Sequence, residues 1–213
     1  MHPQKTLPCP AKWREMNGAL RERIGWRSRD NGSKPSAMFS WLKKKPAPMT
    51  DCVWMTDEAR VAGIVRSDPK LVIAFFEASR ARYAALLPNA KVLLVDQIKP
   101  AFDKAQEGPE VCVVEHHPLP SQNDRLLEKL VGLSPHTPTF HVALDEPIMR
   151  LFGGDRVLAM MQQLGMKPDE WVTHPLVSKS LDNARHKLAA KVSMELQASS
   201  MEEWFARNVA EKI

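Results

Sequence analysis

The side chains best suited to chemistry stand just after the apolar runs of this sequence. Six acids and histidines share that position: Asp96 after 92–95; Glu115, His116 and His117 after 111–114; Asp145 and Glu146 after 139–144. Ligands of open α/β sheets bind outside the carboxyl ends of the strands, so these residues are the candidates for a binding site. A histidine pair beside acids can hold a metal ion or act as a general base, because imidazole titrates near neutral pH.

A structural role is the stronger interpretation of the two histidines. Adjacent residues at a strand end point in different directions, and strand ends commonly carry polar residues. The sequence contains neither G-x-S-x-G nor H-E-x-x-H, and Cys9, Cys52 and Cys112 form no C-x-x-C pair. We therefore assign no catalytic residue and no metal site, and a small-ligand enzyme using His116 and His117 stays as an alternative.

The elements that position these residues follow an alternating pattern from Val53 onward. Short apolar runs predict strands at 71–76, 92–95, 111–114 and 139–144, and helical patterns at 57–65, 77–87, 101–106 and from Ser121 lie between them. Thr56 is placed to cap the first helix, and Ser121 and Asp124 have capping-box spacing for the last. The fold class predicted is α/β, with a small doubly wound, mostly parallel sheet of about four strands.

Beyond residue 150 the sequence turns helical. Asp155 is a candidate cap for a helix over 156–164 that ends before Gly165, and Pro168 begins a short helix carrying Trp171. In a helix starting at His174-Pro175, an apolar stripe is expected opposite a solvent-facing row. The stripe comprises Val177, Leu181, Ala184, Leu188 and Val192, and the row comprises Lys179, Asp182, Arg185 and Lys187. A last helix packed on the rest of the domain is predicted by Trp204, Phe205 and Val209.

The basic character of the chain lies in its first 50 residues. The net charge is +5, but residues 1–50 hold eleven Lys and Arg against three acids. Six prolines and no apolar period indicate a flexible arm. Within it an apolar cluster precedes three lysines, the pattern of a weak anchor for acidic lipid: Phe39, Trp41 and Leu42, then Lys43, Lys44 and Lys45. A solvated arm is the equal alternative, and translation can start at Met1 or at Met38.

Localisation and partner class follow from what the sequence lacks. No apolar run is long enough for a membrane span and no signal-peptide core is present, so we expect a cytoplasmic protein, peripheral at the inner face of the membrane if the arm binds lipid. Trp13 and Trp26 among basic residues suit stacking on bases, but no nucleic-acid-binding module is recognised and nucleic acid is not the expected partner.

The segment from Phe140 to Val192 resembles the bacterial preprotein translocase motor SecA. It carries four matching stretches in the same order: Ile148–Phe152, Asp155–Val157, Leu164–Pro168 and His174–Lys179. Glu115-His116-His117 stands where that family has E-R-H. The resemblance implies a degenerate RecA-like domain, the second nucleotide-binding domain of the motor, over 51–150. Residues 151–213 then resemble the start of the helical scaffold, after the arm of residues 1–50.

Departures from that family pattern argue against catalysis. The motor's arginine-rich stretch Q-L-R-G-R-A-G-R-Q-G supplies charge to ATP phosphates, whereas Leu126–Leu133 here contains no arginine. The family's A-G-R-G-T-D loop has no counterpart between Val95 and Val111, and neither a Walker A sequence nor G-x-G-x-x-G occurs.

We expect no cofactor, with residual ATP binding left open, and a non-catalytic protein-binding module of protein export. Its partner is the translocase motor or channel, and a membrane- or nucleic-acid-associated adaptor is the remaining alternative.

Overall fold

The computed structural model describes residues 48–99, 108–131, 133–151, 153–163, 165, 167, 169–173 and 175–209. These residues belong to one compact unit, Lys45–Ile213. Several sequence predictions lie outside the described residues: the membrane contacts Phe39, Trp41, Leu42, Lys43, Lys44 and Lys45; the start at Met38; the helix over 101–106; and the roles of Pro168 and His174. The side chain of Asp155 is likewise not described.

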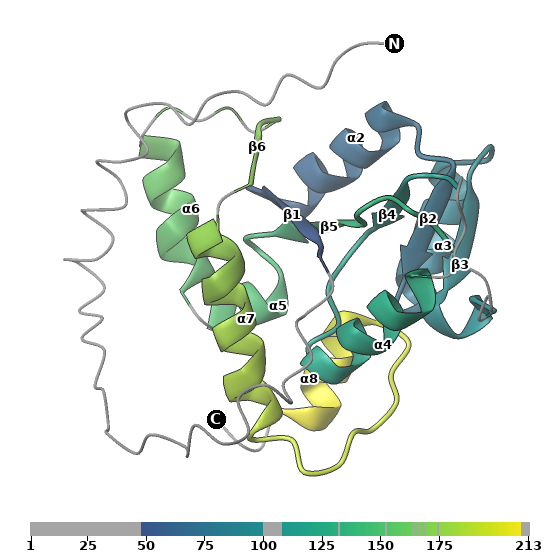
Figure 1. Ribbon diagram of the computed structural model, residues 1–213. Helices are drawn as coiled ribbons and strands as arrows, with labels where there is room; N and C mark the ends of the chain where they lie inside the picture. The colour runs from purple at the N-terminus through teal and green to yellow at the C-terminus, as the bar shows by residue number, and fades with distance from the viewer. Residues whose placement is uncertain are drawn as a thin grey trace, which may run out of the picture. The chain divides into compact units, whose positions relative to one another are not determined.

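A six-stranded sheet forms the centre of the described unit (Figure 1). Its strands are β1 (Thr50–Trp54), β2 (Leu71–Ala74), β3 (Lys91–Leu94), β4 (Val111–Val113), β5 (Thr139–Ala143) and β6 (Trp171–Val172). The order is β3-β2-β4-β5-β1-β6, in which all neighbours are parallel except β6, which runs antiparallel to β1. The predicted α/β class with a mostly parallel sheet is confirmed, and β1 and β6 are strands that the sequence analysis missed.

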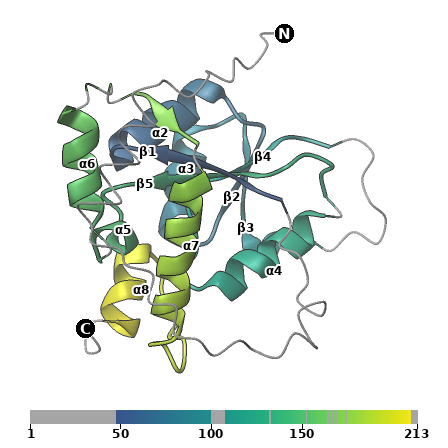
Figure 2. The same ribbon diagram turned by 60° about the vertical axis from the view of Figure 1, so that its left-hand side comes forward.

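Helices cover both faces of the sheet (Figure 2). On one face α2 (Asp57–Ser67) and α3 (Glu77–Leu86) enclose a cluster that includes Ile64, Val72 and Tyr83. On the other face α4 (Pro120–Leu130) packs Leu126 and Leu130 against the strands. Because both faces are covered, β2 is buried at every residue, which explains its unbroken apolar run.

Local interactions at the helix ends agree with one predicted cap and correct another. The Thr56 hydroxyl accepts a hydrogen bond from the Ala59 amide, as predicted for the start of α2. Helix α4 instead begins at Pro120 with no side-chain cap, so the capping box proposed at Ser121 is wrong. A proline is favoured at the first helical position, because it has no amide hydrogen there and its fixed φ suits the helix.

The C-terminal third adds four helices and a short edge strand. They are α5 (Pro147–Leu151), α6 (Gly154–Gln163), α7 (Pro175–Ala189) and α8 (Met201–Asn208). Leu181 and Leu188 of α7 pack with Trp204 of α8 in one buried cluster, as predicted. Gly165 adopts the left-handed conformation predicted beyond α6, with φ of 74°.

Three predictions for this third are wrong. Helix α6 begins at Gly154, so Asp155 lies inside the helix and is not its N-cap. Trp171 lies in β6 and not in a helix, because an aromatic residue followed by valine suits a strand and β1 offers an open edge. Arg185 is 1% exposed and does not face solvent, because its charge interacts with the buried Asp51 of β1.

Candidate functional site

Three consecutive residues after β4 point into three separate environments. Glu115, His116 and His117 are all buried, at 2%, 2% and 7% exposure. Glu115 faces the start of α3, His116 faces α7 and β1, and His117 faces α8. The prediction that the adjacent histidines diverge is confirmed, and the two rings do not share a site.

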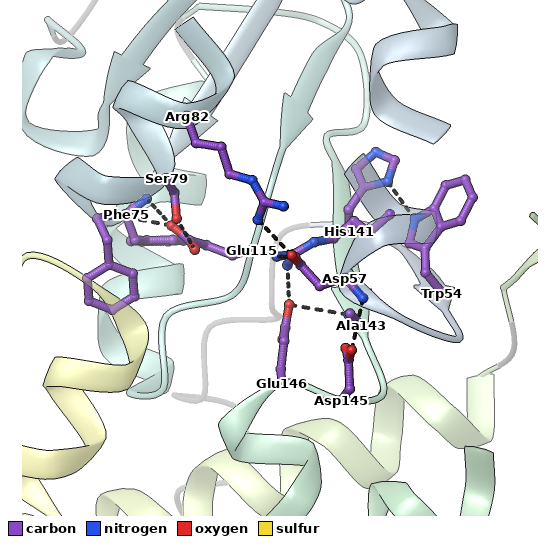
Figure 3. A network of polar contacts seen from close by, with 12 residues as sticks. Trp54, Asp57, Phe75, Ser79, Arg82, Glu115, His141, Ala143, Asp145 and Glu146 are labelled. Atoms are coloured by element: carbon purple, nitrogen blue, oxygen red, sulfur yellow. Dashed lines mark hydrogen bonds and ion pairs between the residues drawn. The ribbon is translucent and has the colours of Figure 1, made fainter. Parts of the chain in front are cut away.

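Glu115 holds the N-terminal end of α3 in place. Its Oε1 accepts hydrogen bonds from the amides of Phe75 (3.1 Å) and Phe76 (3.2 Å), and its Oε2 accepts one from the Ser79 hydroxyl (2.6 Å) (Figure 3). Burial raises the pKa of Glu115, and the hydrogen bond from Ser79 and the charge of Arg60 oppose that rise. The carboxyl group therefore serves as a helix cap supplied from the neighbouring strand.

Arg60 of α2 is the centre of a second buried group. Its guanidinium pairs with Glu146, which follows β5, and with Asp57 at the start of α2. Burial raises the pKa of Glu146 to about 7, although the charge of Arg60 and a hydrogen bond from the Ala143 amide act to lower it. The guanidinium of Arg60 thus forms ion pairs with two acids.

The same group fixes the start of α2. Asp145 Oδ2 accepts a hydrogen bond from the Asp57 amide at 3.2 Å, and Arg82 of α3 reaches Asp57 Oδ2 at 2.6 Å (Figure 3). Asp145 therefore acts as an additional acceptor at the N-terminal end of α2, where the helix dipole favours a carboxylate. Its role in the described contacts is structural.

A third buried group joins α7 to the sheet through His116. The His116 Nε2 lies 2.9 Å from Asp51 Oδ1 of β1, and Arg185 of α7 contacts His116 Nδ1. Burial lowers the pKa of His116, and the Arg185 charge lowers it further. A neutral ring that donates from Nε2 to the Asp51 carboxylate and accepts at Nδ1 from Arg185 satisfies both contacts.

Asp51 is ionised at the centre of this group. Burial alone would raise its pKa, but hydrogen bonds from His116 and Ser178 and the charge of Arg185 lower it. Asn123 of α4 completes the enclosure, since its Nδ2 donates to the carbonyls of His117 and Leu119. The arrangement connects β1 and α7, which are distant in the sequence, to the segment between β4 and α4.

His117 packs in an aromatic environment against α8. Its ring stacks on Phe76 at 5.5 Å between centroids and meets the Trp204 ring edge-on at 5.8 Å. The Leu119 amide donates to its Nδ1 at 3.1 Å, and its Nε2 lies 3.2 Å from Glu195. Burial lowers the pKa of His117 to about 4 in spite of Glu195, so the ring is neutral at physiological pH.

Asp96 stands apart from the buried residues. Its side chain is 77% exposed and lies 3.2 Å from Arg125 and 3.8 Å from Lys129, both on α4. The predicted strand-end residues therefore do not form one site: Glu115 and Asp145 bind the starts of α3 and α2, His116 and His117 face elsewhere, and Asp96 is on the surface.

The residues that organise these groups were largely missed from the sequence. Arg60 and Arg185 are charged, and charged residues are expected to face solvent. A signal was nevertheless present, because Arg60 lies four residues before buried Ile64 and Arg185 four residues after buried Leu181, on the inner faces of their helices. His141 shows no such signal, and it accepts a hydrogen bond from Trp54 Nε1 at 3.0 Å inside the core.

The arrangement is suited to charge pairing and not to proton transfer at a surface. Within the part of the chain that the structure describes, no three His, Cys, Asp or Glu side chains are grouped to hold a metal ion. Cys52 and Cys112 are free and buried, and burial raises the pKa of the Cys52 thiol to about 11. None of the described helices is both long and apolar enough to cross a bilayer.

Fold and site together define a small α/β domain with a mostly parallel sheet and a helical extension, in which buried acids at the strand ends are bound by the surrounding helices. No family model matches the sequence. The chain is similar to part of protein translocase subunit SecA of Acidithiobacillus ferrooxidans, at 47% identity over 92 residues, which is 41% of this chain and 10% of that protein.

Two further relatives carry the same name. SecA of Methylococcus capsulatus is 31% identical over 116 residues, which is 49% of this chain and 12% of that protein. SecA of Acinetobacter baumannii is 44% identical over 57 residues, which is 27% of this chain and 6% of that protein. The matched region thus spans about a tenth of these relatives, and it relates the chain to a fragment of SecA.

Proposed function

We propose that the chain is a non-catalytic, protein-binding module of the protein-export machinery. It derives from the second nucleotide-binding domain and the start of the helical scaffold of a SecA-type motor, and it docks on such a motor or on the membrane channel. The similarity to SecA subunits supports the link to export. Similarity of fold alone does not transmit a function. The non-catalytic role therefore needs support from the site itself.

The observation that carries the non-catalytic role is the internal pairing of the charges at the strand ends. Glu115 is bound to the start of α3, and Glu146 is paired with Arg60. A nucleotide site needs cationic side chains and amides that are directed at the phosphates. Here the cations Arg60 and Arg185 are both buried and engaged with acids or histidine of the same domain.

Helix α4 supports the same conclusion. It includes most of Leu126–Leu133, the stretch that stands in place of the motor's arginine-rich segment, and its Leu126, Leu127 and Leu130 are buried in the core against the sheet. An arginine finger must project toward phosphate oxygens. At these positions the side chains are apolar and directed inward, which favours a structural use of the helix.

The histidine pair supports the enzyme alternative weakly. His116 contacts Asp51 and Arg185 through its two ring nitrogens, and His117 contacts Glu195 and the Leu119 amide. A general base needs a nitrogen within reach of substrate. The contacts of both rings favour their use in packing.

The basic arm adds a proposed second contact. Phe39, Trp41 and Leu42 with Lys43, Lys44 and Lys45 form a short sequence suited to the headgroups of an acidic membrane. Such a contact supports a proposed location at the cytoplasmic face of the membrane, beside a translocase channel. A single short cluster gives weak and reversible attachment, so the main affinity comes from the protein partner.

The experiment measures binding and catalysis with purified components. The full-length chain is immobilised and exposed to the SecA-type motor of the source organism and to its channel in vesicles. In parallel, calorimetry tests the chain with ATP and Mg²⁺, and a phosphate-release assay tests hydrolysis. The expected result is saturable binding to the motor or the channel, a change in the motor's ATPase rate, and no phosphate release by the chain alone. Lack of binding to either component, or hydrolysis above a buffer blank, refutes the proposal.

A further inference from the structure

The neighbouring strands β2 and β4 lead into helices on opposite faces of the sheet. The two strands pair in parallel, and the Val114 amide extends the pairing by donating to the Ile73 carbonyl at 3.0 Å. After β2 the chain enters α3, which packs on the face that carries Val72, and after β4 it enters α4, which packs on the opposite face. Open α/β sheets bind ligands at the carboxyl ends of two such diverging strands, here called the switch position.

Helix α3 begins at the switch position without a cap of its own. Its N-cap residue is Phe76, whose side chain makes no capping hydrogen bond. Most helices begin at Ser, Thr, Asp or Asn, because these side chains accept hydrogen bonds from the first amides. A helix start whose donors are left to a group from elsewhere is the usual arrangement for binding an anion.

Glu115 provides the group that accepts from these donors. The amides of Phe75 and Phe76 both donate to its Oε1, and the Ser79 hydroxyl donates to its Oε2 (Figure 3). Glu115 reaches α3 from the end of β4 and is 2% exposed. Both carboxylate oxygens are therefore held by donors, and the bound group is closed off from solvent.

Arg60 adds positive charge beside the same carboxylate. Arg60 is 7% exposed, and its charge opposes the rise in the pKa of Glu115 that burial causes. Among the residues that the structure describes, no acceptor is bonded to Arg60 Nε. The switch position thus combines two amides, a hydroxyl and a nearby cation, which are the groups that proteins use to bind anions.

We propose that Glu115 is an internal ligand, which fills a carboxylate-binding site at the switch position and thereby keeps external anions out. The site suits one planar carboxylate, because two amides meet one oxygen and the Ser79 hydroxyl meets the other. The inference goes beyond the proposed function and does not depend on it, since neither the occupied site nor its test involves an export partner.

The test removes the internal ligand and supplies an external one. The variant Glu115→Ala of the full-length chain lacks one CH2 and the carboxylate, and acetate replaces both. Melting temperatures are measured at about pH 7.5 in sucrose, which favours folded states, with equal concentrations of sodium acetate, sodium chloride or acetamide. At about ten times its dissociation constant, acetate should raise the melting temperature of the variant by about 3–6 °C relative to chloride. Neutral acetamide should not, because it lacks the charge.

The wild type and Glu77→Ala are the matched controls. Glu77 is an exposed acid in the first turn of the same helix, where it pairs with Arg80, so its removal leaves the site filled by Glu115. Neither control should melt higher in acetate than in chloride. In Glu115→Ala the amide resonances of Phe75 and Phe76 should shift with the same acetate dependence as the melting temperature, which locates the bound acetate.

Each outcome decides for or against the internal ligand. Saturable rescue of Glu115→Ala by acetate alone, with shifts of the two amides, supports it. Equal melting temperatures in acetate and chloride, equal rescue by acetamide, or an acetate effect in either control overturns it. If the variant is unfolded in chloride, acetate should restore a cooperative transition, and failure to restore it also counts against the proposal. Binding to the motor or channel is measured separately, so its absence would leave this result unchanged.

Discussion

Replacing His141 should change how the stability of the domain depends on pH. His141 is buried on β5, and its Nδ1 accepts a hydrogen bond from Trp54 Nε1. Burial, and secondarily the nearby charge of Arg60, lowers the pKa of His141 from 6.5 to about 3. The substitution His141→Asn keeps an acceptor near the Nδ1 position and removes the titrating group.

The sign and magnitude follow from proton linkage. The neutral folded ring binds a proton less readily than the unfolded one, so its stabilising contribution is present above pH 6.5 and is lost as pH falls toward 3. Each pKa unit corresponds to about 1.4 kcal/mol, so lowering the pH from about 7.5 to about 5 removes about 2 kcal/mol of unfolding free energy through His141. The asparagine variant does not have this loss.

Other buried groups titrate in the same range, so the comparison with the wild type is essential. His117, with its pKa lowered to about 4, acts in the same direction, whereas Glu146, with its pKa raised to about 7, stabilises the fold as the pH falls. Both groups are present in wild type and variant and cancel in the difference.

The assay is urea denaturation followed by tryptophan fluorescence at about pH 7.5 and about pH 5, at constant ionic strength. His141→Asn should be less stable than the wild type at the higher pH because of its lost volume, and it should regain about 2 kcal/mol relative to the wild type at the lower pH. The same substitution at exposed His136 controls for removal of an imidazole. A difference between variant and wild type that does not change with pH would refute the reasoning, since the ring would then ionise as easily in the fold as in the unfolded chain.

Three further substitutions test the packing and the buried charges. A Cβ at Gly63 would lie 2.0 Å from the Trp54 ring, so Gly63→Ala should lower the urea-derived stability by about 1–3 kcal/mol instead of raising it as expected in a helix. Thr56→Ala, which removes the cap of α2, should lower the thermal stability by about 1 kcal/mol. Arg185→Met leaves Asp51 buried beside a neutral ring and should cost about 3–5 kcal/mol in urea denaturation. Adding Asp51→Asn should recover part of that loss, and a purely additive second loss would contradict the pairing.

The parts of the fold that the sequence predicted are those where local pattern and tertiary environment agree. Leu71–Ala74 is a run of apolar residues and is covered on both faces, so pattern and burial point to the same strand. β1 was missed because Asp51 interrupts its apolar pattern, and a buried acid is recognisable only once its partners His116 and Arg185 are in place. A two-residue strand such as β6 depends on the open edge of its neighbour, which the local sequence does not encode.

The sequence predicted where the candidate residues lie but not which side chains they contact. The residues after the strands do lie at the ends of strands, and the divergence of His116 and His117 follows from backbone geometry. Several of their partners are more than 60 positions away, as with Asp51 for His116 and Arg60 for Glu146. No local spacing encodes such a pair.

The long reach of these pairs has a consequence for synthesis of the protein. His116 and its partner Arg185 are 69 positions apart in the chain. During translation β1 to β5 leave the ribosome well before α7, so Asp51 and His116 are synthesised long before Arg185, with which they pair. A domain with such distant contacts closes its large loops late and folds slowly. The nascent chain therefore exposes apolar surface until its last helices emerge, and this exposure favours aggregation during synthesis.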